Sequence, residues 1–167
     1  YYPNVLDEDR ECQKKSIDHL MKVIQASALL KINLVTTFIG RNKNLNITDN
    51  LELAENVWKP ILEHAESKNV RIAIENCPMF FTEDEWPGGK NIAVSPAIWR
   101  ELFKRLPSEY LGLNFDPSHF IWQEMDYIRP LYEFKDKIFH VHYKDIRVDK
   151  EARNEVGVLA TPLSYMV

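Results

Sequence analysis

Apolar side chains recur at intervals of three and four residues in two long stretches, which predicts two amphipathic helices. The first covers residues 9–30, and its apolar face holds Ile17, Leu20, Met21, Ile24, Ala28 and Leu29. The second is expected to start at a capping box made by Asp49 and Glu52. Its apolar face holds Leu51, Ala54, Val57, Trp58, Ile61, Leu62 and Ala65. Pro60 should kink or restart this helix, because proline removes a backbone hydrogen bond.

Short runs rich in branched apolar residues separate these helical stretches and predict buried strands. We expect four of them, at residues 33–39, 70–74, 111–115 and 138–141. A third helix should begin at Ser95-Pro96, with serine as the cap and proline in the first turn. A short helical stretch over residues 120–134, interrupted near Asp126, should precede the last strand.

The alternation of helix and strand predicts an α/β protein with a parallel sheet and outer helices. Two architectures fit this order, an open doubly wound sheet and part of a (β/α)₈ TIM barrel. The length of 167 residues favours the open sheet, because a whole barrel needs about 250 residues. Residues 1–167 are interpreted as a single domain, and the start at Tyr1 without methionine suggests part of a longer chain.

Charge and composition argue against several classes of binding partner. The formal net charge is -4 without any block of Lys and Arg, which argues against nucleic acid as a partner. No apolar run approaches the ~20 residues that span a bilayer, so we expect no membrane partner. Cys12 and Cys77 stand in unrelated contexts, which is typical of reduced thiols in a cytoplasmic protein.

Three of the predicted strands end in a residue that can bind metal: Glu75, Asp116 and His142. In a parallel α/β fold the carboxyl ends of all strands lie on one side, where active sites form. These side chains should therefore converge there. Two carboxylates and an imidazole suit one divalent ion, Mn²⁺, Mg²⁺, Co²⁺ or Zn²⁺. For any one of them alone, an exposed strand-end residue or an ion-pair partner is the competing interpretation.

The same residues carry a family resemblance. The strings IAIENCP (72–78), LNFDPSH (113–119) and HVHYKD (140–145) resemble the xylose isomerase-like barrel superfamily, the sugar phosphate isomerase/epimerase group. TFIGR (37–41) and FTEDEWPGGKN (81–91) resemble one subgroup of it. The resemblance favours the barrel over the open sheet, and it implies a partial barrel that holds strands three to six.

Site roles follow from the resemblance residue by residue. Glu75 corresponds to the first metal ligand and to a catalytic acid/base, Asp116 to the second ligand and His142 to the third. His119 corresponds to a residue that contacts substrate oxygens. The fourth ligand of the family, a glutamate on the last strand, lies outside this chain.

The function implied is a metal-dependent isomerase or epimerase of a small sugar or sugar phosphate, which removes a proton next to a carbonyl through a metal-stabilised enediolate. A sugar or inosose dehydratase remains open, since it needs the same groups. An endonuclease IV-like nuclease on the same barrel would need about three zinc ions and more histidines than the 5 present. An inactive fragment is the third class, and we expect the isolated chain to bind metal weakly and to lack turnover. Assembly into a homo-oligomer also stays open.

Further candidates are less specific. Lys144 and Asp145 follow His142 and could reach substrate, although a surface ion pair fits equally well. Arg41 could hold an anionic group, although a surface arginine is the favoured interpretation. Trp86 could cover a sugar from the long loop at residues 77–94, or equally anchor that loop by hydrophobic contacts. Asn76 and Asn114 flank the metal residues and could orient them, while His140 should lie near the site, two residues before His142.

Overall fold

A computed structural model describes residues 3–78, 89–158 and 160–167 of the chain. Four strands form one sheet in the order β1-β2-β3-β4, and every neighbouring pair is parallel. The strands are β1 (Leu34–Thr37), β2 (Arg71–Glu75), β3 (Leu111–Phe115) and β4 (Ile138–Val141). The prediction of four parallel strands in an α/β fold is confirmed, with β1 shorter than expected.

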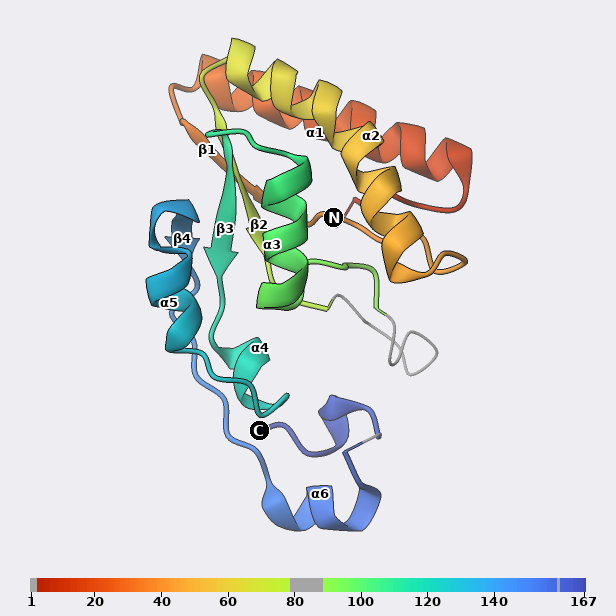
Figure 1. Cartoon of the computed structure of the whole chain (residues 1–167), viewed down its shortest axis with the longest axis vertical. Helices are drawn as coiled ribbons and strands as arrows, with labels where there is room; N and C mark the ends of the chain where they lie inside the picture. Colours follow the sequence, from red (N-terminus) through yellow and green to blue (C-terminus); the bar gives the residue numbers. More distant parts are fainter. Residues whose placement is uncertain (1–2, 79–88, 159) are drawn as a thin grey trace.

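Helix α1 (Arg10–Leu29) precedes β1, α2 (Ile47–Ser67) connects β1 to β2, and α3 (Pro96–Arg105) connects β2 to β3. Figure 1 shows α1 and α2 side by side and α3 lying along β2 and β3. Asp9 caps α1 by accepting a hydrogen bond from the backbone N–H of Cys12. Helices thus cover the sheet, as strands with apolar residues on both sides require.

Helix α2 differs from its prediction at its start. It begins three residues earlier than the predicted box, because Asn46 is the cap and accepts a hydrogen bond from the backbone N–H of Asp49 at 2.9 Å. Pro60 lies inside the helix without restarting it. The apolar face around Pro60 is buried, with Trp58 and Ile61 at 0% exposure, and this packing holds the helix together across the missing hydrogen bond.

The chain after β3 is built from short elements. Helices α4 (Ser118–Ile121) and α5 (Arg129–Glu133) replace the single interrupted stretch that was predicted. The 3₁₀ turn η2 (Lys135–Lys137) leads into β4. Beyond β4 lie α6 (Lys150–Val156) and the 3₁₀ turn η3 (Pro162–Ser164), which the sequence pattern had not indicated. Figure 1 shows this last part of the chain beyond the carboxyl ends of the strands.

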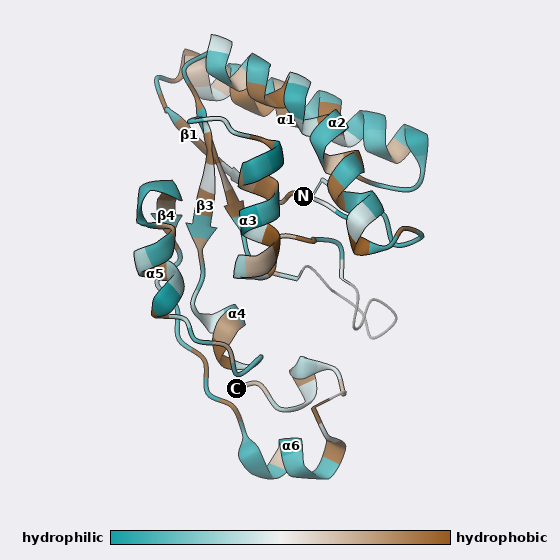
Figure 2. Cartoon of the chain, in the orientation of Figure 1, coloured by the Kyte–Doolittle hydropathy of each residue, from teal (hydrophilic) through white to brown (hydrophobic). Residues whose placement is uncertain are grey.

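Two tryptophans anchor the core between sheet and helices. Trp58 donates from Nε1 to the carbonyl of Ile39 at 2.9 Å, and Trp99 donates to the carbonyl of Ala93 at 2.7 Å. Both indole N–H groups are therefore satisfied, as burial of tryptophan demands. Figure 2 shows hydrophobic residues along the strands and alternating hydrophobic and hydrophilic residues along the helices. This arrangement fixes the strand ends that carry the candidate site.

Strand β4 contains a β-bulge, which sets the direction in which its two histidines point. Leu113 pairs with Ile138, but the next residue, Asn114, pairs with His140, so Phe139 is an extra residue of the bulged strand. Gly112 makes room for it: a Cβ at Gly112 would lie 2.5 Å from the Phe139 ring and 2.4 Å from the carbonyl oxygen of Lys137. Arg71 covers the same ring, with its guanidinium carbon 4.7 Å from the centroid.

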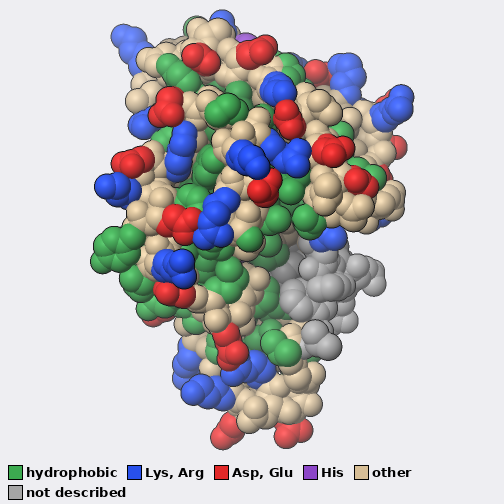
Figure 3. Space-filling model, in the orientation of Figure 1, with side chains coloured by type: hydrophobic (Ala, Val, Ile, Leu, Met, Phe, Trp, Pro, Cys, Tyr) green, Lys and Arg blue, Asp and Glu red, His purple; other side chains and the backbone are tan. Residues whose placement is uncertain are grey.

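Within the described residues, no helix is both long and apolar enough to cross a membrane. Figure 3 shows Lys and Arg side chains interspersed with Asp and Glu over the face in view. A mixed surface of this kind agrees with the small net charge of -4.

Candidate functional site

Side chains from the ends of β2, β3 and β4 meet at one point. Nδ1 of His142 lies 3.2 Å from Oε1 of Glu75 and 3.6 Å from Oδ2 of Asp116. One ligand atom from each of the three lies within 4.8 Å of the others. The geometry therefore brings the three predicted metal ligands together, although their roles as ligands stay a prediction.

Asp116 presents one oxygen to the cluster and anchors the other. Its Oδ1 accepts hydrogen bonds from the backbone N–H and the hydroxyl of Ser118, at 3.0 and 2.6 Å. Its Oδ2 is buried and accepts no hydrogen bond, while Nζ of Lys144 lies 2.7 Å away as an ion pair. Burial acts to raise the pKa of Asp116, but Lys144, Ser118 and His119 outweigh it and lower the pKa. Asp116 is thus a buried carboxylate whose Oδ2 faces a cation, which here is the Lys144 ammonium.

Two asparagines hold the backbone of the site. Asn76 donates from Nδ2 to the carbonyl of Asp116 at 2.8 Å and accepts from the N–H of Asp116 at 2.7 Å. Asn91 donates to the carbonyls of Glu75 and Cys77 at 2.8 and 2.7 Å. Both asparagines are buried. The end of β2 is therefore tied to the end of β3 and to the segment before α3.

A third asparagine lies between the two histidines of β4. The amide nitrogen of Asn114 lies 3.1 Å from Nε2 of His142, and its oxygen lies 2.9 Å from Nδ1 of His140. This contact leaves Nδ1 of His142 to face the carboxylates. The expectation that His140 lies near the site is confirmed, and Asn114 orients both rings as a metal site requires of its outer residues.

A divalent cation fits this donor set. A buried carboxylate oxygen without a hydrogen bond, a second carboxylate and a correctly turned imidazole nitrogen are the groups that such ions bind. Their present separations are compatible with ligands around one ion after small side-chain shifts. Glu75, Asp116 and His142 would hold it.

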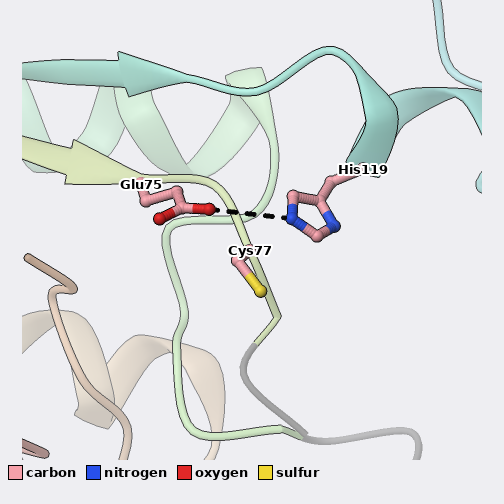
Figure 4. Close-up of side chains that lie close together, drawn as sticks. All are labelled: Glu75, Cys77 and His119. Atoms are coloured by element: carbon pink, nitrogen blue, oxygen red, sulfur yellow. Dashed lines mark ion pairs between the residues drawn. The ribbon is translucent and has the colours of Figure 1, made fainter. Parts of the chain in front are cut away.

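His119 borders the cluster from α4. Its Nε2 lies 3.4 Å from Oδ2 of Asp116 and 3.8 Å from Oε1 of Glu75. Figure 4 shows Glu75 and His119 reaching toward each other from β2 and α4, with Cys77 beside them. Burial acts to lower the pKa of His119, but hydrogen bonds with Cys77 and Glu75 and charge on Cys77 and Asp116 raise it to about 9. In the metal-free protein His119 is therefore a cation at neutral pH.

The remaining predicted site residues are placed differently. Lys144 joins the cluster through Asp116, and its Nζ also lies 3.5 Å from Nε2 of His119. Asp145 is exposed and its carboxylate accepts the N–H of Ile146, so the structure shows it capping its own turn. The backbone of Arg41 exchanges hydrogen bonds with the side chain of Asn4. Trp86 lies outside the described residues.

Sequence reasoning did not include Cys77 and Asn91 in the site. One signal for Cys77 was available, because a residue two positions after Glu75 in extended backbone points to the same side. No local pattern marks Asn91, since its partners lie 14 and 16 residues away.

An open cavity of about 480 Å³ lies beside His142. Lys144 and Asp145 line it together with Tyr143, and apolar side chains from β3, β4 and α5 complete its wall. Its volume falls in the range of small-molecule sites. Of the three candidate metal ligands, His142 lines this cavity, and Glu75 and Asp116 do not.

Comparison with known proteins identifies the fold family. Residues 1–160 match the family model described as the xylose isomerase-like TIM barrel. The chain belongs to the xylose isomerase-like TIM barrel family. Its predicted family membership and its partial-barrel architecture are both confirmed, while its placement at strands three to six stays a prediction.

Relatives of the xylose isomerase-like chain include one curated protein and several solved structures. It is 30% identical over 105 residues to the uncharacterized protein YfiH of Bacillus subtilis (strain 168), covering 62% of this chain and 30% of YfiH. It superposes on a D-tagatose 3-epimerase-like protein with a TM-score of 0.65 and 19% identity, over 83% of this chain and 51% of that one. For the probable 3-DHS dehydratase AsbF of Bacillus anthracis the TM-score is 0.69 at 18% identity, over 87% and 49%. The chain thus spans about half the length of these structures.

Proposed function

We propose that the protein is a metal-dependent isomerase or epimerase of a small sugar or sugar phosphate. The convergence of Glu75, Asp116 and His142 at the carboxyl ends of three parallel strands carries this proposal. In TIM barrels this side holds the active site. The likeness to a D-tagatose 3-epimerase-like protein supports the choice of a sugar. One divalent ion, Mn²⁺, Mg²⁺, Co²⁺ or Zn²⁺, is the cofactor proposed.

Glu75 is the proposed base. Its side chain is 13% exposed, so it lies at the border between the buried ligands and the open side, where a substrate carbon could approach. There it would accept the proton from the carbon next to the carbonyl and return it after rearrangement. A bound divalent cation would act as a Lewis acid on the adjacent substrate oxygens.

Two cationic groups would bind substrate oxygens. His119, whose pKa is raised to about 9 in the metal-free protein, can donate to a hydroxyl or carbonyl oxygen. Burial acts to lower the pKa of Lys144, but Asp116, Glu75 and Cys77 raise it, so its ammonium stays charged beside the cavity. Both positive charges would strengthen the binding of the phosphate group of a sugar phosphate. Arg41, Asp145 and Trp86 remain proposed substrate contacts.

A dehydratase is the second candidate. The protonated His119 lies 3.8 Å from the proposed base Glu75, so an acid and a base stand side by side. Such a pair could remove a proton and protonate a departing hydroxyl group. The fold likeness to a probable dehydratase agrees with this option.

The test uses the full-length protein with added metal. Candidate ketoses and their phosphates are incubated in deuterated water, and NMR follows deuterium uptake next to the carbonyl. Glu75→Gln should lower the rate by about 10²–10⁴-fold, the usual contribution of a general base. The matched control is Glu63→Gln, at an exposed position of α2, which should leave the rate unchanged. Full activity in Glu75→Gln would remove Glu75 from the mechanism.

Product and metal analysis separate the alternatives. An epimer or aldose–ketose pair indicates isomerisation, and loss of water indicates the dehydratase. About three zinc ions per chain together with cleavage of DNA would support the nuclease. The cytoplasmic location and assembly into a homo-oligomer remain predictions from the sequence.

A further inference from the structure

A second group of potential metal ligands lies next to the first. One ligand atom each from Glu75, Cys77 and His119 lies within 4.8 Å of the others. All three side chains are partly buried. Figure 4 shows Glu75 and His119 on opposite sides of the gap between the end of β2 and α4, with Cys77 on the segment that leaves β2. Only Glu75 is shared with the group that contains Asp116 and His142.

The backbone under these side chains is fixed on both sides of the gap. Asn91 holds the carbonyls of Glu75 and Cys77 at 2.8 and 2.7 Å. Gly89 has a φ of 64° and leaves space for the carbonyl of Pro78, which a Cβ would approach to 2.1 Å. The N–H of Lys90 binds that same carbonyl at 3.0 Å. The backbone that carries Cys77 is therefore held by hydrogen bonds from Asn91 and Lys90.

The opposite side of the gap is equally defined. His119 follows Asp116 on α4, where Ser118 binds the Asp116 carboxylate. Asn76, between Glu75 and Cys77, exchanges two hydrogen bonds with the Asp116 backbone. The two ligand-bearing segments are thus joined directly, and the donor atoms need little reorganisation to bind an ion.

The chemistry of this second group differs from that of the first. A thiolate, an imidazole and a carboxylate are all ligand types that zinc binds, and three protein ligands leave a fourth position open to water or substrate. Sulfur disfavours Mg²⁺ and Mn²⁺ relative to Zn²⁺ and Co²⁺. The first group has no sulfur and accepts hard or borderline ions. A carboxylate has two oxygens, so Glu75 can serve ions in both positions, as in sites with two metals about 3.5–4 Å apart. With both ions bound neither oxygen would accept a proton, so the proposed base role of Glu75 belongs to the protein with the first ion alone.

We propose that Cys77, His119 and Glu75 form a second cation site, selective for a thiophilic divalent ion such as Zn²⁺, beside the site formed with Asp116 and His142. Binding there needs Cys77 as a thiolate and His119 as a neutral imidazole, so the protons that these two groups hold are released. It also turns His119 from a hydrogen-bond donor into a ligand. The second ion consequently changes which groups face the substrate.

Cobalt titration of the full-length protein tests this site directly. A Co²⁺–thiolate bond produces a ligand-to-metal charge-transfer band in the near ultraviolet, which oxygen and nitrogen ligands do not produce. We expect this band in the wild type, with two equivalents of Co²⁺ bound. Cys77→Ser should lose the band and one equivalent. Cys12→Ser is the matched control, because Cys12 is exposed on α1, and it should keep both.

The first site is removed separately with His142→Ala. This variant should lose one equivalent of Co²⁺ and the proposed isomerase activity, and it should keep the charge-transfer band. Failure of the proposed function and failure of the second site are therefore distinguishable. No band in the wild type, or an unchanged band in Cys77→Ser, would overturn the second site.

A measurement on the unmutated protein tests the second site without relying on variants that could misfold. Mass spectrometry after alkylation should show Cys77 protected by Zn²⁺ and Cys12 modified equally with and without it. Equal modification of Cys77 with and without Zn²⁺ would refute thiolate ligation.

Discussion

Asn76 and Asp116 are joined by two hydrogen bonds of 2.8 and 2.7 Å across the carboxyl ends of β2 and β3. The asparagine amide satisfies both backbone groups of the aspartate, and its own exposure is 1%. A side chain thereby continues the sheet hydrogen bonding one step past the strands. This pair sets the position of Asp116 relative to Glu75, the residue before Asn76.

Asn76→Ala should destabilise the fold and weaken the metal site together. It leaves the N–H and the carbonyl of Asp116 buried without partners, each at about 1–3 kcal/mol. We expect the free energy of unfolding to fall by about 2–4 kcal/mol and metal affinity to fall by about 10- to 100-fold, as for other residues that orient ligands. Urea unfolding and metal titration measure the two effects. Asn44→Ala at an exposed position is the control, and equal behaviour of the two variants would contradict this role.

Gly112→Ala should destabilise the sheet, although glycine inside a strand is usually less favourable than alanine. The added Cβ would meet the Phe139 ring at 2.5 Å and the Lys137 carbonyl at 2.4 Å. Overpacking of this kind costs about 1–3 kcal/mol. Chemical unfolding of the single variant measures the cost. If the ring is the main obstacle, the double variant with Phe139→Ala will show a loss smaller than the sum of the two single losses.

The sheet and the long helices could be predicted because their signals are local. Runs such as 70–74 combine branched residues with flanking polar ones, and α2 shows an apolar face over five turns. The start of α2 could not be chosen correctly, because Asn46 and Asp49 both offer a capping side chain, and the structure uses Asn46. Asp149, the cap of α6, precedes good helix formers and was overlooked.

The site residues also include some that the sequence marks and some that it does not. Glu75, Asp116 and His142 could be found because a strand end is a place that the sequence marks. Asn91 could not, since its partners lie 14 and 16 residues away in the sequence, and Cys77 is marked only by its position two residues after Glu75. The contact of Lys144 with Asp116 was equally hidden, because it depends on the path after β4 and on a β-bulge at Phe139.

Lys144 should compete with the metal ion for Asp116. Its Nζ lies 2.7 Å from Oδ2 of Asp116, where a bound cation would need that oxygen. Lys144→Met removes the competing charge, so metal affinity at the first site should rise. The rise should be at most about fivefold, since a part-exposed ion pair is worth up to about 1 kcal/mol. Calorimetric titration with Mn²⁺ measures it, with Lys22→Met on α1 as the control. Weaker binding in Lys144→Met would show that the lysine supports the site instead.

Because of His119, the free energy of unfolding of the metal-free protein should fall as the pH rises into the alkaline range. Burial alone would lower its pKa, but Cys77, Glu75 and Asp116 raise it from 6.5 to about 9. The folded protein therefore holds this proton more tightly than the unfolded chain. The resulting stabilisation is complete below about pH 6.5 and is lost as the pH rises through about 9. A shift of this size corresponds to about 3 kcal/mol.

Urea unfolding at several pH values, with a chelator present, tests this dependence. Between pH 6.5 and 9 the free energy of unfolding should fall more steeply in the wild type than in His119→Gln, which has no proton to lose. NMR titration of the His119 ring in the folded protein should give a midpoint near 9, and Cys77→Ala should move that midpoint down, because Cys77 supplies part of the upward shift. Parallel pH profiles for wild type and His119→Gln would mean that the His119 proton contributes nothing to folding. A ring that titrates near its ordinary value of 6.5 would further show that Cys77 and the carboxylates do not act on it.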